Sequence, residues 1–197
     1  GPNTTQEKVL SAIPESVVAL ERKLNLGVKS IPYALLLTSF NNPRKTFHYY
    51  PFMDWFGKFI ALPEVEELGE LFCQAIDQSP DAPEVKRSVC DGSLVRDLCS
   101  PDDTSFILGR QEEGRWLFKL HADFFNTEGN RIRGRTSSTG MIVLTCINLP
   151  LKLANDPAYI YIAGLIEGHK EPDSKIAAHR HYLRPLVTEF ETAWSRG

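Results

Sequence analysis

Leu117-Phe-Lys-Leu-His-Ala-Asp-Phe-Phe125 is the stretch that decides the fold, a β-prone run that carries one acid, Asp123. Two further apolar runs follow it, at Gly140–Asn148 and Pro157–Gly168, and a helix-like segment spans about Ser174–Ser195. We expect that helix to pack on the sheet through Leu183, Leu186, Val187, Phe190 and Trp194. Short apolar runs bounded by glycine, proline and polar residues are typical of buried strands. The order strand, strand, strand, helix therefore predicts an α+β (α/β) domain with a mixed sheet.

A strand with a central Asp, two more strands and a helix is the order in which an RNase-H-like nucleotidyl-transfer core begins. In such cores the first metal-binding carboxylate lies midway along the first strand, where Asp123 lies here. We therefore expect residues 80–197 to form a partial RNase-H-like domain that ends where its second half would begin. The alternative for Asp123 is an edge acid that accepts a backbone hydrogen bond, because a buried carboxylate is costly without such partners.

Residues 1–79 are predicted to form a helical N-terminal lobe, which the turn-forming Ser79–Pro83 separates from the sheet domain. The clearest helix is Pro63–Asp77, whose glutamates occupy the first turns, where the helix dipole favours anions. Its apolar periodicity predicts an inward face made of Val65, Leu68, Phe72 and Ile76. Phe47–Leu62 predicts a short strand and then a helix from about Pro51. The remaining predicted elements are a helix over Ser11–Gly27, an apolar strand at Ile31–Ser39, a short helix at Ser93–Cys99 and a strand at Ser105–Gly109.

The composition is that of a globular domain, with 42% hydrophobic and 24% charged residues. No apolar run reaches the roughly 20 residues that a membrane span needs, so we expect no membrane partner and a nuclear or cytoplasmic location. The cysteines show no C-x-x-C pair and are expected to be free thiols in a reducing compartment, with a zinc site or a disulfide as the alternative. No nucleophile–base pair or glycine-rich phosphate loop indicates a small-molecule enzyme.

The charge is unevenly distributed, which places any contact with DNA on the C-terminal half. Residues 51–113 hold 14 acidic and 5 basic side chains, a balance of −9, whereas residues 114–197 hold 11 basic and 8 acidic. Within the 126–139 loop, Arg131, Arg133 and Arg135 alternate, so an extended ribbon would project them to one side, toward a phosphate backbone. A solvated hairpin tip is the alternative for this loop.

Two-metal phosphoryl transfer needs at least two carboxylates that converge on ions about 4 Å apart. Asp123 supplies one, and Lys119 and His121 share its strand face. The other acids nearby fall in loops or at strand ends: Glu128, Asp156, Glu167, Glu171 and Asp173. We therefore expect the isolated chain to be catalytically inactive and to bind no metal by itself.

Residues 120–187 resemble the transposases of fungal, mainly basidiomycete, CACTA- and Plavaka-like DNA transposons. The segments that carry the resemblance are Asp123-Phe-Phe-Asn126, Cys146-Ile-Asn-Leu-Pro150, Gly164-Leu-Ile-Glu-Gly168 with Glu171-Pro172, and His181-Tyr-Leu-Arg-Pro-Leu186. The upstream part looks similar as well, through Tyr49-Tyr-Pro-Phe52 and Asp91-Gly92 to Gly114-Arg115, so that the resemblance runs over about residues 50–195.

The resemblance implies an RNase-H-like core that uses an Asp-Asp-Glu set and Mg²⁺ to cut and join DNA, with Asp123 as the first acid and metal ligand. The family's later acids have no counterpart before Gly197, and the stretch Tyr33–Ser39 lacks the cysteines that such transposases often carry upstream. Two hypotheses follow: a transposase-derived domain whose intact parent transfers DNA strands, and a domesticated, non-catalytic module that binds protein or DNA.

A sheet that ends after its third strand would leave unpaired backbone groups beside the Asp123 strand, and such an edge pairs readily with another chain. The sequence predicts one of two solutions. Either the edge binds a protein partner or a second copy, or Ile31–Ser39 caps it as a surrogate strand, which we favour because that segment is apolar and of strand length.

Overall fold

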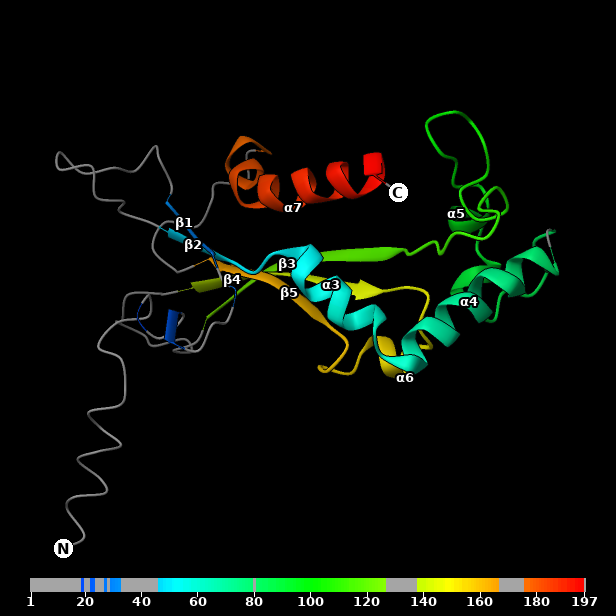
Figure 1. Ribbon diagram of the computed structural model, residues 1–197, viewed down its shortest axis with the longest axis horizontal. Coiled ribbons are helices and arrows are strands. Elements are labelled where there is room, and N and C mark those ends of the chain that lie inside the picture. The colour runs from blue at the N-terminus through cyan, green and yellow to red at the C-terminus, as the bar shows by residue number, and fades with distance from the viewer. Residues whose placement is uncertain are drawn as a thin grey trace, which may run out of the picture. The chain divides into compact units, whose positions relative to one another are not determined.

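The computed structural model describes residues 19, 22–23, 27, 29–32, 46–79, 81–126, 138–166 and 176–196. This part of the chain is a mixed α+β structure with one open sheet (Figure 1). Its elements in chain order are β1 (Lys29–Pro32), β2 (Thr46–Tyr49), α3 (Phe52–Ile60), α4 (Pro63–Asp77), η2 (Val89–Asp91), α5 (Ser93–Arg96), β3 (Phe118–Asn126), β4 (Ser138–Cys146), α6 (Leu151–Ala154), β5 (Tyr161–Ile166) and α7 (Ile176–Arg196).

The described strands lie in the order β1-β2-β5-β4-β3. The three strands predicted from the C-terminal half are therefore adjacent, with β4 in the middle, as expected. β2 pairs antiparallel with β1 and with β5, placing Phe47 opposite Ile166. The described sheet is antiparallel, so the expectation of a mixed sheet is wrong for this part of the chain.

The position of β1 also corrects the expected cap on the Asp123 strand. Ile31 and Pro32 belong to β1, which pairs with β2 at the opposite end of the sheet from β3. Residues 33–39, the rest of that predicted strand, lie outside the described residues, as does most of the predicted helix at Ser11–Gly27. Among the described strands, β3 therefore stands at one end of the sheet.

Two compact units divide the chain, and both are discontinuous in sequence. The first comprises Gly1–Asp54, Ala122–Ile142 and Ala163–Gly197, and the second comprises Trp55–His121 and Val143–Ile162. The domain boundary predicted near residue 79 falls inside the second unit. Strands β3, β4 and β5 each contribute residues to both units.

In the first unit, α7 packs on β2 through aromatic side chains. Tyr182 meets the ring of Phe47 edge-on, with centroids 5.4 Å apart, and Phe190 contacts Phe52 at 4.6 Å. The backbone N–H of Met53 donates to the Glu189 carboxylate at 3.0 Å. These contacts fix α7 against the start of α3 and against β2.

The predicted C-terminal helix is confirmed, but part of its predicted contact face is wrong. Leu186 is buried, and Leu183 and Phe190 are half-buried, whereas Val187 and Trp194 are 46% and 51% exposed. Tyr182 is buried in their place, because β2, which the sequence did not place in this sheet, offers it the Phe47 ring.

In the second unit, α4 has the bounds that the sequence predicts, Pro63–Asp77. Pro63 begins the helix, where a missing N–H costs nothing, and Glu64 and Glu66 lie in the first turn. The buried face includes Val65 and Ile76 as predicted, and Cys73 beside them. Aromatic side chains of α3 form a cluster with three aromatic residues from later in the chain. Its members are Trp55, Phe56, Phe59, Trp116, Phe118 and Tyr161.

The prediction of a strand at Ser105–Gly109 is wrong. These residues form a turn closed by a hydrogen bond from Gly109 N–H to the Ser105 carbonyl at 2.9 Å, and only Ser105 makes a single bridge, to Cys99. Phe106 and Ile107 are both buried in the core with Cys73 and Ile76. A strand would send these consecutive residues to opposite faces, whereas the turn buries both.

Candidate functional site

Asp123 lies on β3, and its side chain is exposed to solvent. One carboxylate oxygen accepts a hydrogen bond from the backbone N–H of Phe124 at 2.8 Å. A solvated carboxylate with a local backbone donor pays no burial cost, so it needs no metal to be stable at this position. This geometry agrees with the alternative of an edge acid, and the assignment of Asp123 as catalytic and metal-binding stays a prediction.

The other predicted metal-site residues do not gather around a common point in the described part of the chain. Among the described residues, no three or more His, Cys, Asp or Glu side chains come together in a way that could hold a metal ion. His121 is exposed and its Nε2 lies 3.5 Å from the Thr145 hydroxyl. Asp156 accepts from the Ala158 N–H at 2.9 Å and so stabilises a turn. Arg131, Arg133 and Arg135, the predicted DNA-binding residues, lie outside the described residues, as do Glu128, Glu167, Glu171 and Asp173.

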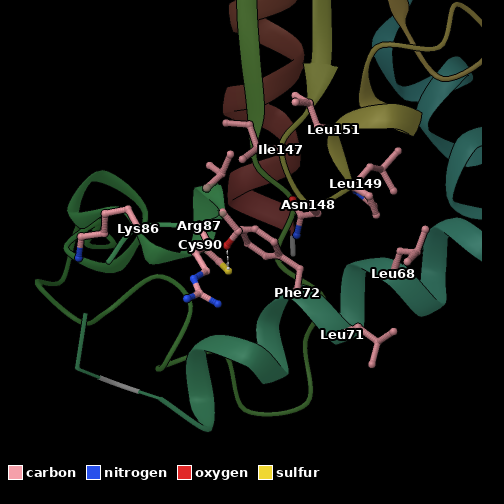
Figure 2. Close-up of a pocket in the computed structure, with 13 residues that line it drawn as sticks. Leu68, Leu71, Phe72, Lys86, Arg87, Cys90, Ile147, Asn148, Leu149 and Leu151 are labelled. Carbon is pink, nitrogen blue, oxygen red and sulfur yellow. Dashed lines mark hydrogen bonds between the residues drawn. The ribbon is translucent and has the colours of Figure 1, made fainter. Parts of the chain in front are cut away.

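A groove of about 640 Å³ opens within the second unit, between α4, residues 86–90 and residues 147–151 (Figure 2). Leu68, Leu71 and Phe72 line it from α4, at helix positions i, i+3 and i+4. Figure 2 shows the Phe72 ring pointing from the helix toward Asn148 and Cys90. The opposite side is formed by Leu149 and neighbouring residues at the end of β4. We call this cavity the α4 groove.

Asn148 holds the β4 side of the α4 groove in place. Its side chain is buried, with Oδ1 accepting from the Leu117 N–H at 2.8 Å and Nδ2 donating to the Arg115 carbonyl at 2.8 Å. A buried amide that is paired at both ends stabilises one backbone arrangement, since leaving either atom unpaired would cost about 1–3 kcal/mol. Beside it, burial raises the pKa of the Cys146 thiol to about 11.

Asp91 fixes the loop on the other side. Its carboxylate accepts from the backbone N–H groups of Arg87 and Ser88, at 2.8 and 2.9 Å. These two hydrogen bonds lower the pKa of Asp91, so the carboxylate is charged at neutral pH. Ser88 Oγ lies 2.7 Å from Cys90 Sγ, the contact drawn dashed in Figure 2. The loop therefore presents the Lys86 and Arg87 side chains from a defined backbone.

The residues of the α4 groove are not among the site residues that the sequence predicts. The sequence predicts that Leu68 and Phe72 lie on the inward face of α4. In the structure both are half-buried and line the groove instead. The available signal was Leu71, an apolar residue on the same helix that is 50% exposed. An apolar residue beside the buried stripe widens the apolar face beyond what one core needs.

No helix in the described ranges is both long enough and apolar enough to cross a membrane. Comparison of the chain with protein-family models, with curated proteins and with solved structures finds no match in any of the three.

Proposed function

We propose that this chain is a transposase-derived domain with the first part of an RNase-H-like sheet, whose intact parent cuts and joins DNA with Mg²⁺. The observation that supports the proposal is the strand order β5-β4-β3, in which the strand that carries Asp123 stands at one end of the described sheet. In an RNase-H-like fold the next strand, with its own carboxylate, pairs at that edge.

Asp123 is the proposed first acid, and it does not form a magnesium site by itself. Two-metal chemistry needs further carboxylates beside it, and the described residues hold no cluster that supplies them. In this proposal the chain has no strand-transfer activity alone, and its own contribution is to present Asp123 and to bind the DNA backbone through Arg131, Arg133 and Arg135.

Binding to duplex DNA at increasing salt, followed by fluorescence anisotropy, tests the proposal. Three phosphate contacts predict weak, sequence-independent binding with a slope of log K against log salt of about −2.7. Replacing Arg131, Arg133 and Arg135 by alanine should remove most of that slope. The matched control replaces Lys152, an exposed lysine of α6. An absence of DNA binding at low salt would sink the proposal, and an unchanged slope in the triple variant would move the contact to other residues.

A cleavage assay with Mg²⁺ or Mn²⁺ tests the second half of the proposal. We expect no cleavage or joining by the chain alone. Metal-dependent cleavage that disappears in Asp123→Ala would show that the chain holds the other ligands as well.

The second candidate function is a non-catalytic module that binds protein. The open, largely apolar α4 groove favours it, because solvent-exposed apolar surface of this kind marks interaction sites.

A further inference from the structure

The α4 groove leaves large apolar side chains in contact with water. Of the residues that line it, Leu71 is 50% exposed, Val89 is 51% exposed and Leu151 is 74% exposed. Together with Leu68, Phe72 and Leu149 they line the groove with apolar side chains from three separate chain segments. Removing this surface from water is favourable by about 25 cal/mol per Å², so a partner that covers it gains free energy.

Two cations lie beside this apolar lining in an otherwise acidic region. Lys86 and Arg87 are the only charged residues that line the α4 groove, while residues 51–113 together have a balance of −9. Other cations of the region are engaged: Arg110 pairs with Glu70 and Asp77, and Arg96 donates to the Cys90 carbonyl at 2.7 Å. Within the described residues, no ion pair engages the side chain of Lys86 or Arg87.

The geometry points to an amphipathic helix of a partner protein as the occupant, with an apolar stripe and acidic side chains along one flank. Leu68, Leu71 and Phe72 form a ridge at i, i+3 and i+4, the spacing on which a second helix packs. The acidic flank lies against Lys86 and Arg87.

A pair of synthetic helical peptides tests the inference directly. Both carry leucines at i, i+3, i+4 and i+7, and they differ only in having Glu or Lys along one flank. We expect the full chain to bind the fluorescein-labelled Glu peptide in anisotropy titrations and to bind the Lys peptide at least tenfold more weakly. Equal affinities would overturn the proposed charge selectivity.

Variants of the chain separate the two contributions. Lys86→Ala with Arg87→Ala should weaken binding of the Glu peptide about tenfold, because it removes two ion pairs that are exposed and therefore individually modest. The same double substitution should change the affinity for the Lys peptide little. Leu151→Ser should weaken binding of both peptides, because it removes an apolar side chain from the lining of the groove. Leu151 is 74% exposed, so the fold should tolerate the change. Matched controls are Lys152→Ala and Leu94→Ser, which change an exposed lysine and an 83% exposed leucine outside the groove.

Cys90 locates the bound peptide, because it lines the α4 groove and is half-buried. In a Cys99→Ser background, which removes the exposed thiol, saturating Glu peptide should slow alkylation of Cys90 by iodoacetamide several-fold. Unchanged alkylation with bound peptide would place the peptide elsewhere and overturn the inference.

The inference does not depend on the proposed DNA function, and the two fail separately. Loss of peptide binding leaves the salt slope of DNA binding unaffected, and the Arg131, Arg133 and Arg135 triple variant leaves peptide binding unaffected. Self-association of the chain that Leu151→Ser abolishes, without peptide binding, would identify a second copy as the occupant and reject a helical partner.

Discussion

Arg110 is a buried cation held by two acids of α4. Its guanidinium lies 2.9 and 3.1 Å from the two Glu70 oxygens and 2.9 Å from Asp77. The hydrogen bond from Arg110, with a second from Gln74, lowers the pKa of Glu70. Both carboxylates remain partly exposed, at 46% and 39%, so water screens much of the attraction. The network joins the loop that carries Phe106 and Ile107 to α4.

Replacing Arg110 by methionine should lower the free energy of unfolding by about 2 kcal/mol, the loss of a few screened, charge-assisted hydrogen bonds. It should also make the free energy of unfolding fall less steeply as the pH is lowered into the acid range. Because the folded pKa of Glu70 lies below its ordinary value of 4.5, its stabilisation is complete above pH 4.5 and is lost as pH falls through the folded pKa.

Urea unfolding between pH 7 and pH 3 measures both effects. The control Lys152→Met changes an exposed lysine of α6 and should follow the native curve. Parallel curves for the native chain and Arg110→Met would show that the ion network does not contribute to the acid dependence.

At the scale of elements, α4 is held against the aromatic cluster by a glycine. A Cβ on Gly69 would lie 2.4 Å from the Trp116 ring. That ring cannot easily move aside, because Phe56 and Phe59 each pack edge-on against it at 6.0 Å. Close approach of the helix to Trp116 therefore requires glycine at this position, although glycine disfavours a helix interior by about 1 kcal/mol.

Gly69→Ala should therefore destabilise the chain, because overpacking costs about 1–3 kcal/mol and exceeds the gain in helix propensity. Gly57→Ala, in α3, is the matched control: nothing lies within 4 Å of its added Cβ, so it should raise stability by about 0.5–1 kcal/mol. Thermal unfolding of both variants checks the prediction, and a stabilised Gly69→Ala would contradict the close contact.

At the scale of the whole molecule, β3 is the strand placed to pair with another chain. It stands at one end of the described sheet, and its Leu120 and Phe125 are 47% and 43% exposed. An apolar terminal strand presents backbone groups that pair with another strand. Since β1 lies at the opposite end, we expect self-association through β3.

Light scattering at micromolar concentration should show a dimer that Leu120→Lys converts to a monomer. A lysine on an edge strand opposes pairing by charge and by its cost of burial. Leu94→Lys, at an exposed leucine outside the sheet, should leave the dimer intact. A native chain that is monomeric throughout would reject pairing through this strand.

Local patterns in the sequence were sufficient to predict α4, α7, β2 with α3, and the three strands β3, β4 and β5. Each depends on the periodicity of its own residues, such as Val65 and Ile76 along α4, or on a residue that marks where an element begins, such as Pro63. Because burial of one face and the dipole at a helix start act over a few residues, such elements can be recognised without the rest of the fold.

Only the tertiary structure decided where those elements meet. The pairing of β2 with β5, the place of β1 away from β3, the turn at Ser105–Gly109 and the exposure of Asp123 all depend on contacts between distant segments. The α4 groove is the clearest case, since α4, residues 86–90 and residues 147–151 are apolar or cationic individually and make a binding surface only together. Burial is a property of the assembled surface, and a sequence pattern shows which residues are apolar but not which of them the fold leaves uncovered.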